Sequence, residues 1–237
     1  MAKKVLLVMM LIVLIINIAA CEVDTDNNDA LQNGNNDNIV GEKDDGKNKD
    51  KNNTKAEYEL TGEGIIKPEF AKKIIEGISN ELIDAISTKD FETVSKFIHP
   101  IKGVRFTPYT YVSSDQDVVF DQEGIKGFFN NQNVYIWGVY DGVGDDISLT
   151  PAQYYEKFIY TEDFKNAEEI GYNKVLSMGN MIENQFEVYD NPIVVEYYFS
   201  GFNPDYAGLD WRSLRLVFEQ YENDWKLVGI IHNQWTT

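Results

Sequence analysis

The sequence predicts an α+β domain in which N-terminal helices pack on a curved antiparallel sheet. Two observations carry this prediction. Apolar residues recur every three or four positions from Phe70 to Ile86, which is the spacing of one helix face. Downstream of Val104 the apolar period changes to two, the spacing of strands, and this pattern is strongest in the last third of the chain.

Two helices are expected at the start of the domain. Pro68 suits the first turn of a helix. The apolar face of this helix comprises Phe70, Ile74, Ile75, Ile78, Leu82, Ile83 and Ile86. Thr88 or Asp90 can cap a second, shorter helix, which ends at His99-Pro100 because the residue before a proline disfavours helical backbone.

The rest of the domain alternates strands with two short helices. The expected strands cover residues 104–106, 118–120, 134–140, 193–199, 213–221 and 225–235. The expected helices cover residues 122–129 and 152–160, the second after a Thr150 cap and Pro151 at its first position. Residues 222–224 (Glu-Asn-Asp) are typical of a hairpin turn between the last two strands.

The closing segment LRLVFEQYENDWKLVGIIHNQW, after two helices and a curved sheet, resembles the NTF2-like (cystatin-like α+β) superfamily. The resemblance covers residues 68–237 and implies a cone whose mouth holds a ligand, an enzyme site or nothing. It carries no catalytic signature, so the fold does not determine a function.

The N-terminus has the features of an export signal. A basic start, Met1 to Lys4, precedes an unbroken apolar run, Val5 to Ile16, which is too short to span a bilayer. Ile18-Ala19-Ala20-Cys21 resembles the lipobox of bacterial lipoproteins. The resemblance implies cleavage before Cys21 and a diacylglyceryl group on its sulfur, which holds the chain on the extracytoplasmic face of the cell membrane. The alternatives are an ordinary secretory signal and an uncleaved anchor.

Composition divides the chain into three parts. Residues 1–20 form the signal peptide. Residues 21–58 carry the lipidated cysteine and an Asn-, Asp- and Lys-rich tether with too few apolar residues to fold. Residues 59–237 form a single α+β domain. Cys21 is the only cysteine, which excludes an intramolecular disulfide.

The chain is strongly acidic, with a net charge of −18 over 237 residues. From Tyr58 onward, 29 acidic residues face 14 basic ones. A phosphate backbone would be repelled, and no basic stripe offers an exception, so nucleic acid is not an expected partner. The expected partners are the membrane, through the N-terminal lipid, and a small ligand or surface protein.

One catalytic hypothesis rests on the last strands. Only His99 and His232 can serve as bases near neutral pH. Simple alternation brings His232 beside Arg215 and Glu219, and Glu196 joins them if the register allows. The alternative is an ordinary cross-strand salt bridge. His99 is expected to interact with the dipole of the helix that ends there.

Two binding hypotheses concern aromatic and acidic residues. The candidate ligand-binding residues are Tyr109, Tyr111, Trp137 and Tyr198, which are otherwise core residues. The candidate calcium ligands are Asp141, Asp145 and Asp146, on a glycine-rich segment that otherwise forms a simple turn. The sequence has no zinc-type spacing, phosphate loop or nicotinamide motif, so no cofactor other than calcium is expected.

These features favour a tethered ligand-binding or protein-interaction module. A small acid–base enzyme, a hydrolase or isomerase using His232, Glu219 and Arg215, is the second hypothesis. A purely structural envelope protein is the third.

Overall fold

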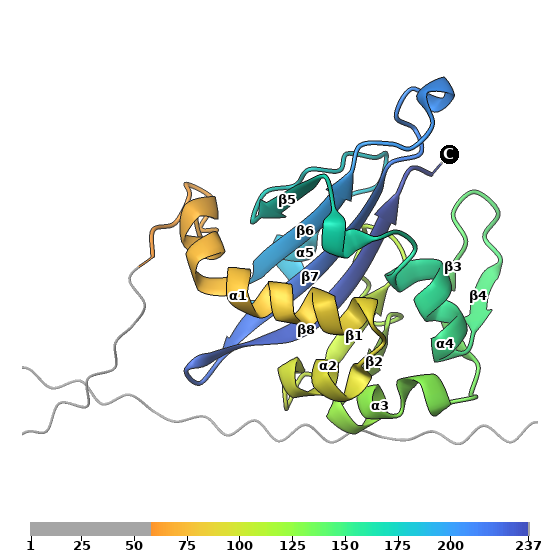
Figure 1. Cartoon of the computed structure of the whole chain (residues 1–237), viewed down its shortest axis with the longest axis horizontal. Helices are drawn as coiled ribbons and strands as arrows, with labels where there is room; N and C mark the ends of the chain where they lie inside the picture. Colours follow the sequence, from red (N-terminus) through yellow and green to blue (C-terminus); the bar gives the residue numbers. More distant parts are fainter. Residues whose placement is uncertain (1–57, 237) are drawn as a thin grey trace, which may run out of the picture. The chain divides into compact units, whose positions relative to one another are not determined.

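The computed structural model describes residues 58–236, which form an α+β domain built around a six-stranded mixed sheet (Figure 1). Residues 1–57, with the signal, the lipobox and the tether, lie outside the described residues. The strands of the large sheet are β1 (Val104–Thr107), β2 (Val118–Phe120), β5 (Glu169–Tyr172), β6 (Ile193–Phe199), β7 (Arg212–Tyr221) and β8 (Asp224–Gln234). Two further strands, β3 (Tyr135–Val139) and β4 (Asp146–Leu149), pair only with each other.

The order of strands in the large sheet is β2-β1-β8-β7-β6-β5. Four of the five pairs are antiparallel, but β1 runs parallel to β8, with Phe106 opposite Ile230. The prediction of a purely antiparallel sheet is therefore wrong. Strands joined by a short hairpin must be antiparallel, whereas β1 and β8 are separated by most of the domain and are free of this constraint.

The long helix α1 (Pro68–Ser87) crosses one face of the sheet, as predicted (Figure 1). Pro68 occupies the first turn, where its missing N–H costs nothing. The buried positions Ala71, Ile75, Leu82 and Ile86 follow the three- and four-residue spacing that the sequence shows. The sheet supplies the other side of this core.

Six shorter helices lie between α1 and β5 along the described chain. They are α2 (Phe91–Phe97), α3 (Gln122–Lys126), η1 (Phe128–Asn130), α4 (Pro151–Tyr154), a π-helical turn η2 (Tyr155–Ile159) and η3 (Phe164–Asn166). The Asp90 side chain caps α2 by accepting from the N–H of Thr93 at 3.0 Å, as predicted. Thr150 and Gln153 form a capping box at the start of α4.

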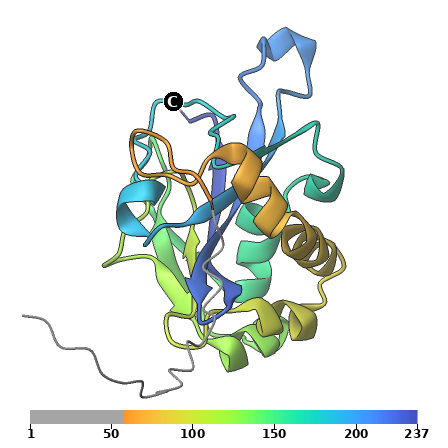
Figure 2. The ribbon, with the colours of Figure 1, turned by 90° about the vertical axis from the view of Figure 1, so that its left-hand side faces the viewer.

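The opposite face of the sheet carries a second, smaller core. Residues 173–192, including α5 (Gln185–Val188), cover this face, on the other side of the sheet from α1 (Figure 2). Tyr189 packs there against Val217 and Ile231. A further short helix, η4 (Pro204–Tyr206), lies in the connection between β6 and β7.

The long hairpin of β7 and β8 contains a β-bulge. Val217 pairs with Gly229, but the next residue, Phe218, pairs with Leu227, so Val228 is an extra residue in β8. The inserted residue reverses the alternation of the strand beyond it. Residues after Val228 therefore point to the opposite faces from those that simple alternation predicts.

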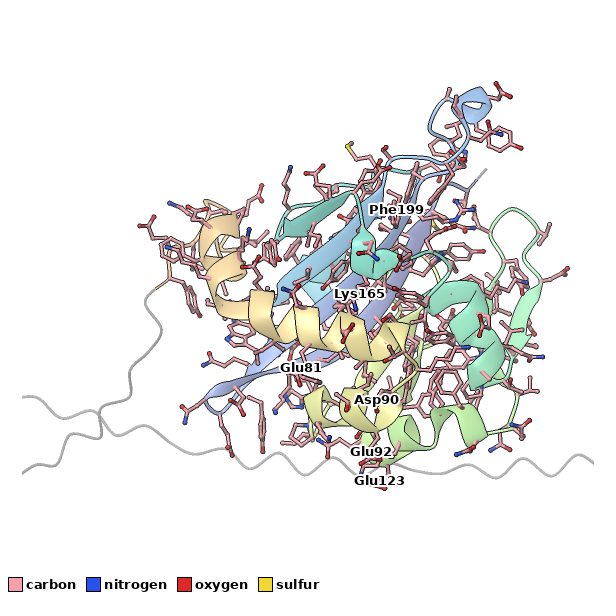
Figure 3. All side chains as sticks on the ribbon, viewed as in Figure 1. Glu81, Asp90, Glu92, Glu123, Lys165 and Phe199 are labelled. Carbon is pink, nitrogen blue, oxygen red and sulfur yellow. The ribbon has the colours of Figure 1, made fainter. Side chains whose placement is uncertain are left out.

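Acidic side chains line the helical side of the domain. Glu81 of α1, Asp90 and Glu92 at the start of α2, and Glu123 of α3 are exposed there (Figure 3). This arrangement agrees with the negative charge of the sequence and forms a solvated surface. Within residues 58–236, no helix is long and apolar enough to cross a membrane.

Candidate functional site

The three predicted catalytic residues do not meet, because His232 lies on the opposite face of the sheet from Arg215. His232 is paired with Leu214, whereas Arg215 is paired with Ile231. Directly opposed residues share a face, and consecutive residues alternate. The bulge at Val228 is the physical reason, since an unbroken alternation from the Lys226–Glu219 pair would have placed His232 beside Arg215.

The environment of His232 is apolar. The imidazole is fully buried, meets the Phe158 ring edge-on with centroids 5.6 Å apart, and has Nδ1 3.3 Å from the carbonyl oxygen of Pro108. Nε2 has no hydrogen-bond partner among the described residues. Burial lowers the pKa of His232 to about 3. A neutral imidazole without access to solvent is not a general base for an external substrate.

Arg215 instead organises a buried ionic network beneath residues 173–192. Its Nη2 donates a hydrogen bond to Oε1 of Glu183 at 3.0 Å. Its Nε lies 3.1 Å from Oε1 of Glu196, and this second contact is an ion pair without the geometry of a hydrogen bond. The side chains of Arg215 and Glu196 are 0% and 1% exposed. Glu196 meets Arg215, because the two are directly opposed on β6 and β7, but the predicted cluster with Glu219 and His232 does not form.

Ser177 lies at the centre of this network and uses its whole hydrogen-bonding capacity. Its hydroxyl accepts from Nη2 of Arg215 at 2.9 Å and from Nδ2 of Asn233 at 3.1 Å, and it donates to Glu196. A buried hydroxyl with these partners and no imidazole beside it is not an activated nucleophile. The network therefore holds the covering segment on the sheet.

Glu219 is separate from this network, near the start of the β7–β8 turn. It pairs with Lys102 and accepts from the backbone N–H of Asp190 at 2.9 Å. Nearby, Nδ1 of His99 accepts from the N–H groups of Ile101 at 3.2 Å and Lys102 at 3.0 Å. Burial lowers the pKa of His99, and an Nδ1 that accepts two hydrogen bonds carries no proton, so the imidazole does not bring the predicted positive charge to the end of α2.

A cavity of about 280 Å³ lies between the segment after β1 and the β3–β4 hairpin. We name it the tyrosine cavity, because Tyr109, Tyr111 and Tyr140 line it together with Asp117 and Met181. Tyr109 is buried, whereas Tyr111 is about half exposed, at 51%. Two of the four predicted ligand-binding residues thus line one hollow.

Hydrogen bonds hold the three segments of the cavity wall in place. The side chain of Asn184 accepts from the N–H of Val112 at 2.8 Å and donates to the carbonyl of Val112 at 2.9 Å. This pair of bonds ties the segment that contains Met181 to the segment after β1. The hydroxyl of Tyr109 accepts from the N–H of Asp141 on the hairpin at 3.4 Å. These contacts bring together residues that are far apart in the sequence.

Asp117 is the most perturbed acid of the tyrosine cavity. Its Oδ2 accepts from the Thr107 hydroxyl at 2.6 Å and from the Ser113 N–H at 3.0 Å. Desolvation nevertheless dominates and raises the pKa of Asp117 to about 6, against the lowering effects of these two bonds and of Arg105. Perturbed acids of this kind are enriched at functional sites.

The Asp117→Asn variant is expected to be more stable than the wild type at pH 7, by about 2–3 kcal/mol. The folded pKa of Asp117 lies above its ordinary value of 3.8, so ionisation opposes folding: the penalty is absent below about pH 4, grows between about pH 4 and 6, and is complete above about pH 6. The gain should therefore disappear on acidification. Urea unfolding of both chains from pH 4 to 7 measures it, with Asp115→Asn as the exposed control in the same segment. An equal gain at both ends of the range would contradict the prediction.

The other two predicted ligand-binding residues lie elsewhere. Trp137 is fully buried and stacks on Tyr154 with centroids 3.8 Å apart, and its Nε1 donates to the carbonyl of Leu149. Tyr198 lies on β6, near Trp211 at 6.3 Å, and does not line the tyrosine cavity. Trp137 is a core residue, so its predicted role in ligand binding is wrong.

The predicted calcium ligands occupy the turn between β3 and β4. The backbone N–H of Tyr140 donates to the backbone carbonyl of Asp145, and the backbone N–H of Gly144 donates to the backbone carbonyl of Tyr140, both at 2.8 Å. Gly142 and Gly144 have positive φ, which favours glycine at such turns. Residues 58–236 contain no group of three His, Cys, Asp or Glu side chains that could hold a metal. The three carboxylates thus do not converge, and only Asp141 reaches the tyrosine cavity.

Sequence reasoning did not identify Asp117, Tyr140 and Met181 as site residues. Asp117 and Tyr140 follow the half-buried pattern of strand ends, and nothing in their local sequence distinguishes them. No family model, curated protein or solved structure matches this chain.

Proposed function

We propose that the chain is an extracytoplasmic lipoprotein, anchored through Cys21, whose domain binds a small ligand in the tyrosine cavity. The observation that carries the binding role is this cavity of about 280 Å³, whose wall combines Tyr109, Tyr111 and Asp117 with residues of two other segments. Pockets that combine aromatic walls with a few polar groups are typical of small-molecule sites.

The anchoring role is supported by the sequence at the N-terminus. A lipobox-like Ile18-Ala19-Ala20-Cys21 follows an apolar run of signal length. Two acyl chains on one cysteine give stable membrane binding, whereas one chain exchanges. The placement of a long helix against a sheet that ends in a hairpin supports an NTF2-like assignment for the domain.

The enzyme hypothesis loses its geometric basis. Arg215 and His232 lie on opposite faces of the sheet, and Glu219 pairs with Lys102. The Arg215 network holds residues 173–192 in place. The Ser177 hydroxyl at its centre donates one hydrogen bond and accepts two, so it has no hydrogen-bonding capacity left for a substrate. Binding without catalysis is the function that the geometry supports best.

Cys21→Ser is expected to abolish lipid attachment and to release the protein from membranes. Serine has no thiol to alkylate, so the acidic domain loses the acyl chains that hold it at the surface. Metabolic labelling with a fatty acid, followed by membrane fractionation, measures both effects. If the variant still fractionates wholly with membranes and its processing is unchanged, the anchoring proposal is wrong.

The binding role is tested by a small panel of charged and neutral compounds. The full chain in a non-ionic detergent is titrated with choline, dimethylbutanol, glucose and acetate, and signals of isotope-labelled tyrosine are followed by NMR. The signals of Tyr109 and Tyr111 should shift with at least one compound, while those of the remote Tyr198 stay unchanged. If no compound shifts the cavity signals, the binding role is wrong.

A further inference from the structure

The tyrosine cavity combines aromatic faces with negative charge. Tyr109, Tyr111 and Tyr140 contribute rings, and Met181 adds a polarisable sulfur. Asp117 and Asp141 contribute carboxylates. No Lys, Arg or His side chain is among the described residues that line the cavity. The wall therefore favours a positive charge over a negative one.

The two carboxylates are not neutralised within the domain. Neither Asp117 nor Asp141 forms an ion pair within residues 58–236. Both hydrogen bonds to Asp117 go to Oδ2, and Oδ1 accepts none from the described residues. Arg105 does not pair with it, since its Nη1 donates to the carbonyls of Ser113 and Ser114 at 3.0 and 3.2 Å. Asp117 thus keeps an unused acceptor at the cavity wall.

One ring of the cavity already holds an ammonium group. Nζ of Lys157 lies 4.6 Å from the centroid of the Tyr140 ring and donates to the Tyr140 hydroxyl at 2.7 Å. This contact has the geometry of a cation–π interaction. No described cation lies over the rings of Tyr109 or Tyr111. The half-exposed ring of Tyr111 is available to an external cation, and the buried Tyr109 offers such a cation only the part of its surface that lines the cavity.

We propose that the tyrosine cavity binds a small organic ammonium ion, with its methylated nitrogen against Tyr109 and Tyr111 and its charge facing the carboxylate of Asp117. This assignment rests on the proposed binding role and names the chemical class of the ligand. Aromatic rings beside a carboxylate are the chemistry that recognises a quaternary ammonium group, because such a cation is weakly hydrated and has no N–H to donate.

The alternatives fit the wall less well. An anion would meet two carboxylates, and the ammonium group beside the wall, that of Lys157, is already bound to Tyr140. A neutral polyol would leave the charge of Asp117 without a counterion in a desolvated site. A second hollow of about 310 Å³ shares Tyr111, Asp141 and Met181 with the tyrosine cavity, so a substituent on the ammonium ion has room beyond it.

The test compares choline with dimethylbutanol, its neutral isostere in which carbon replaces nitrogen, by calorimetric titration of the full chain in a non-ionic detergent. Choline should bind about tenfold more tightly than the isostere or better, since only the charge differs. Asp117→Asn should weaken choline binding by about tenfold while the chain stays folded. Asp115→Asn, an exposed change in the same segment, should bind as the wild type does. Glycerophosphocholine carries the same ammonium group on a lipid head group. If it binds more tightly than choline, the ligand is a lipid head group, and if it binds less tightly, the ligand is a free solute.

The ring contribution is tested with Tyr111, which is half exposed, so that its replacement removes less packing than replacement of the buried Tyr109 would. Tyr111→Ala should weaken choline binding severalfold, and Tyr111→Phe should restore most of it because the aromatic face remains. The assignment is overturned if dimethylbutanol binds as tightly as choline or if Asp117→Asn leaves choline binding unchanged. If glucose or acetate shifts the Tyr111 signal and choline does not, the ammonium assignment fails and the binding role stands. If no compound of the panel shifts it, both fail.

Discussion

Replacing Arg215 by methionine is expected to lower the free energy of unfolding by about 3–5 kcal/mol. The guanidinium is fully buried between Glu196 and Glu183, and Glu196 is itself buried. Methionine fills similar volume but leaves the charge of Glu196 without its counterion in a medium that solvates it poorly. The loss is measured by urea or guanidinium unfolding at pH 7.

A double variant separates the charge from the packing. In Arg215→Met with Glu196→Gln, the neutral amide keeps an oxygen for the N–H of Leu176, so a large part of the lost stability should return. Arg212→Met is the matched control on the same strand, because among residues 58–236 the Arg212 guanidinium donates to two backbone carbonyl oxygens, those of Asp210 and Trp211, and to no carboxylate. It should cost less than about 1 kcal/mol. An equal loss for the two arginine variants would contradict the role of the network.

Only the locally determined parts of the fold could be predicted from the sequence. Local signals were sufficient for α1, for the Asp90 cap and for the β7–β8 hairpin, because periodicity, capping and turn chemistry act over a few residues. The short strands β4 and β5 were not predicted, since their sequences, DISL and EIGY, mix acidic, polar or glycine residues with few apolar ones and show no clear strand pattern. The parallel pairing of β1 with β8 depends on contacts across the whole domain.

The candidate site was also predicted only where local sequence features sufficed. Tyr109 and Tyr111 were identified by residue type, but Trp137 has the same chemistry and lies in the core. The single extra residue Val228 moved His232 to the other face of the sheet and removed the predicted catalytic group. A bulge has no reliable sequence signal, because it depends on how two strands pair rather than on either strand alone.

A buried histidine makes the stability of this domain depend on acid, and His232→Leu should remove that dependence. The folded pKa of His232 is about 3, below its ordinary value of 6.5, so the unfolded chain binds a proton more readily than the folded one. The contribution of His232 is fully present above pH 6.5 and is lost as the pH falls. The difference in unfolding free energy between wild type and variant should therefore change by about 1.4 kcal/mol per pH unit below pH 6.5.

Asp117 opposes this trend, because its raised pKa makes acidification stabilising between about pH 6 and 4. The effect of His232 is consequently clearest in the Asp117→Asn background, where acidification should destabilise the domain without compensation. In NMR, the imidazole of His232 should keep the shifts of its neutral form down to about pH 4, because protonation would place a charge against Phe158 and the Pro108 carbonyl with no carboxylate beside it. A midpoint near pH 6.5 would mean that the ring reaches solvent, and it would reopen the role of His232 as a proton acceptor.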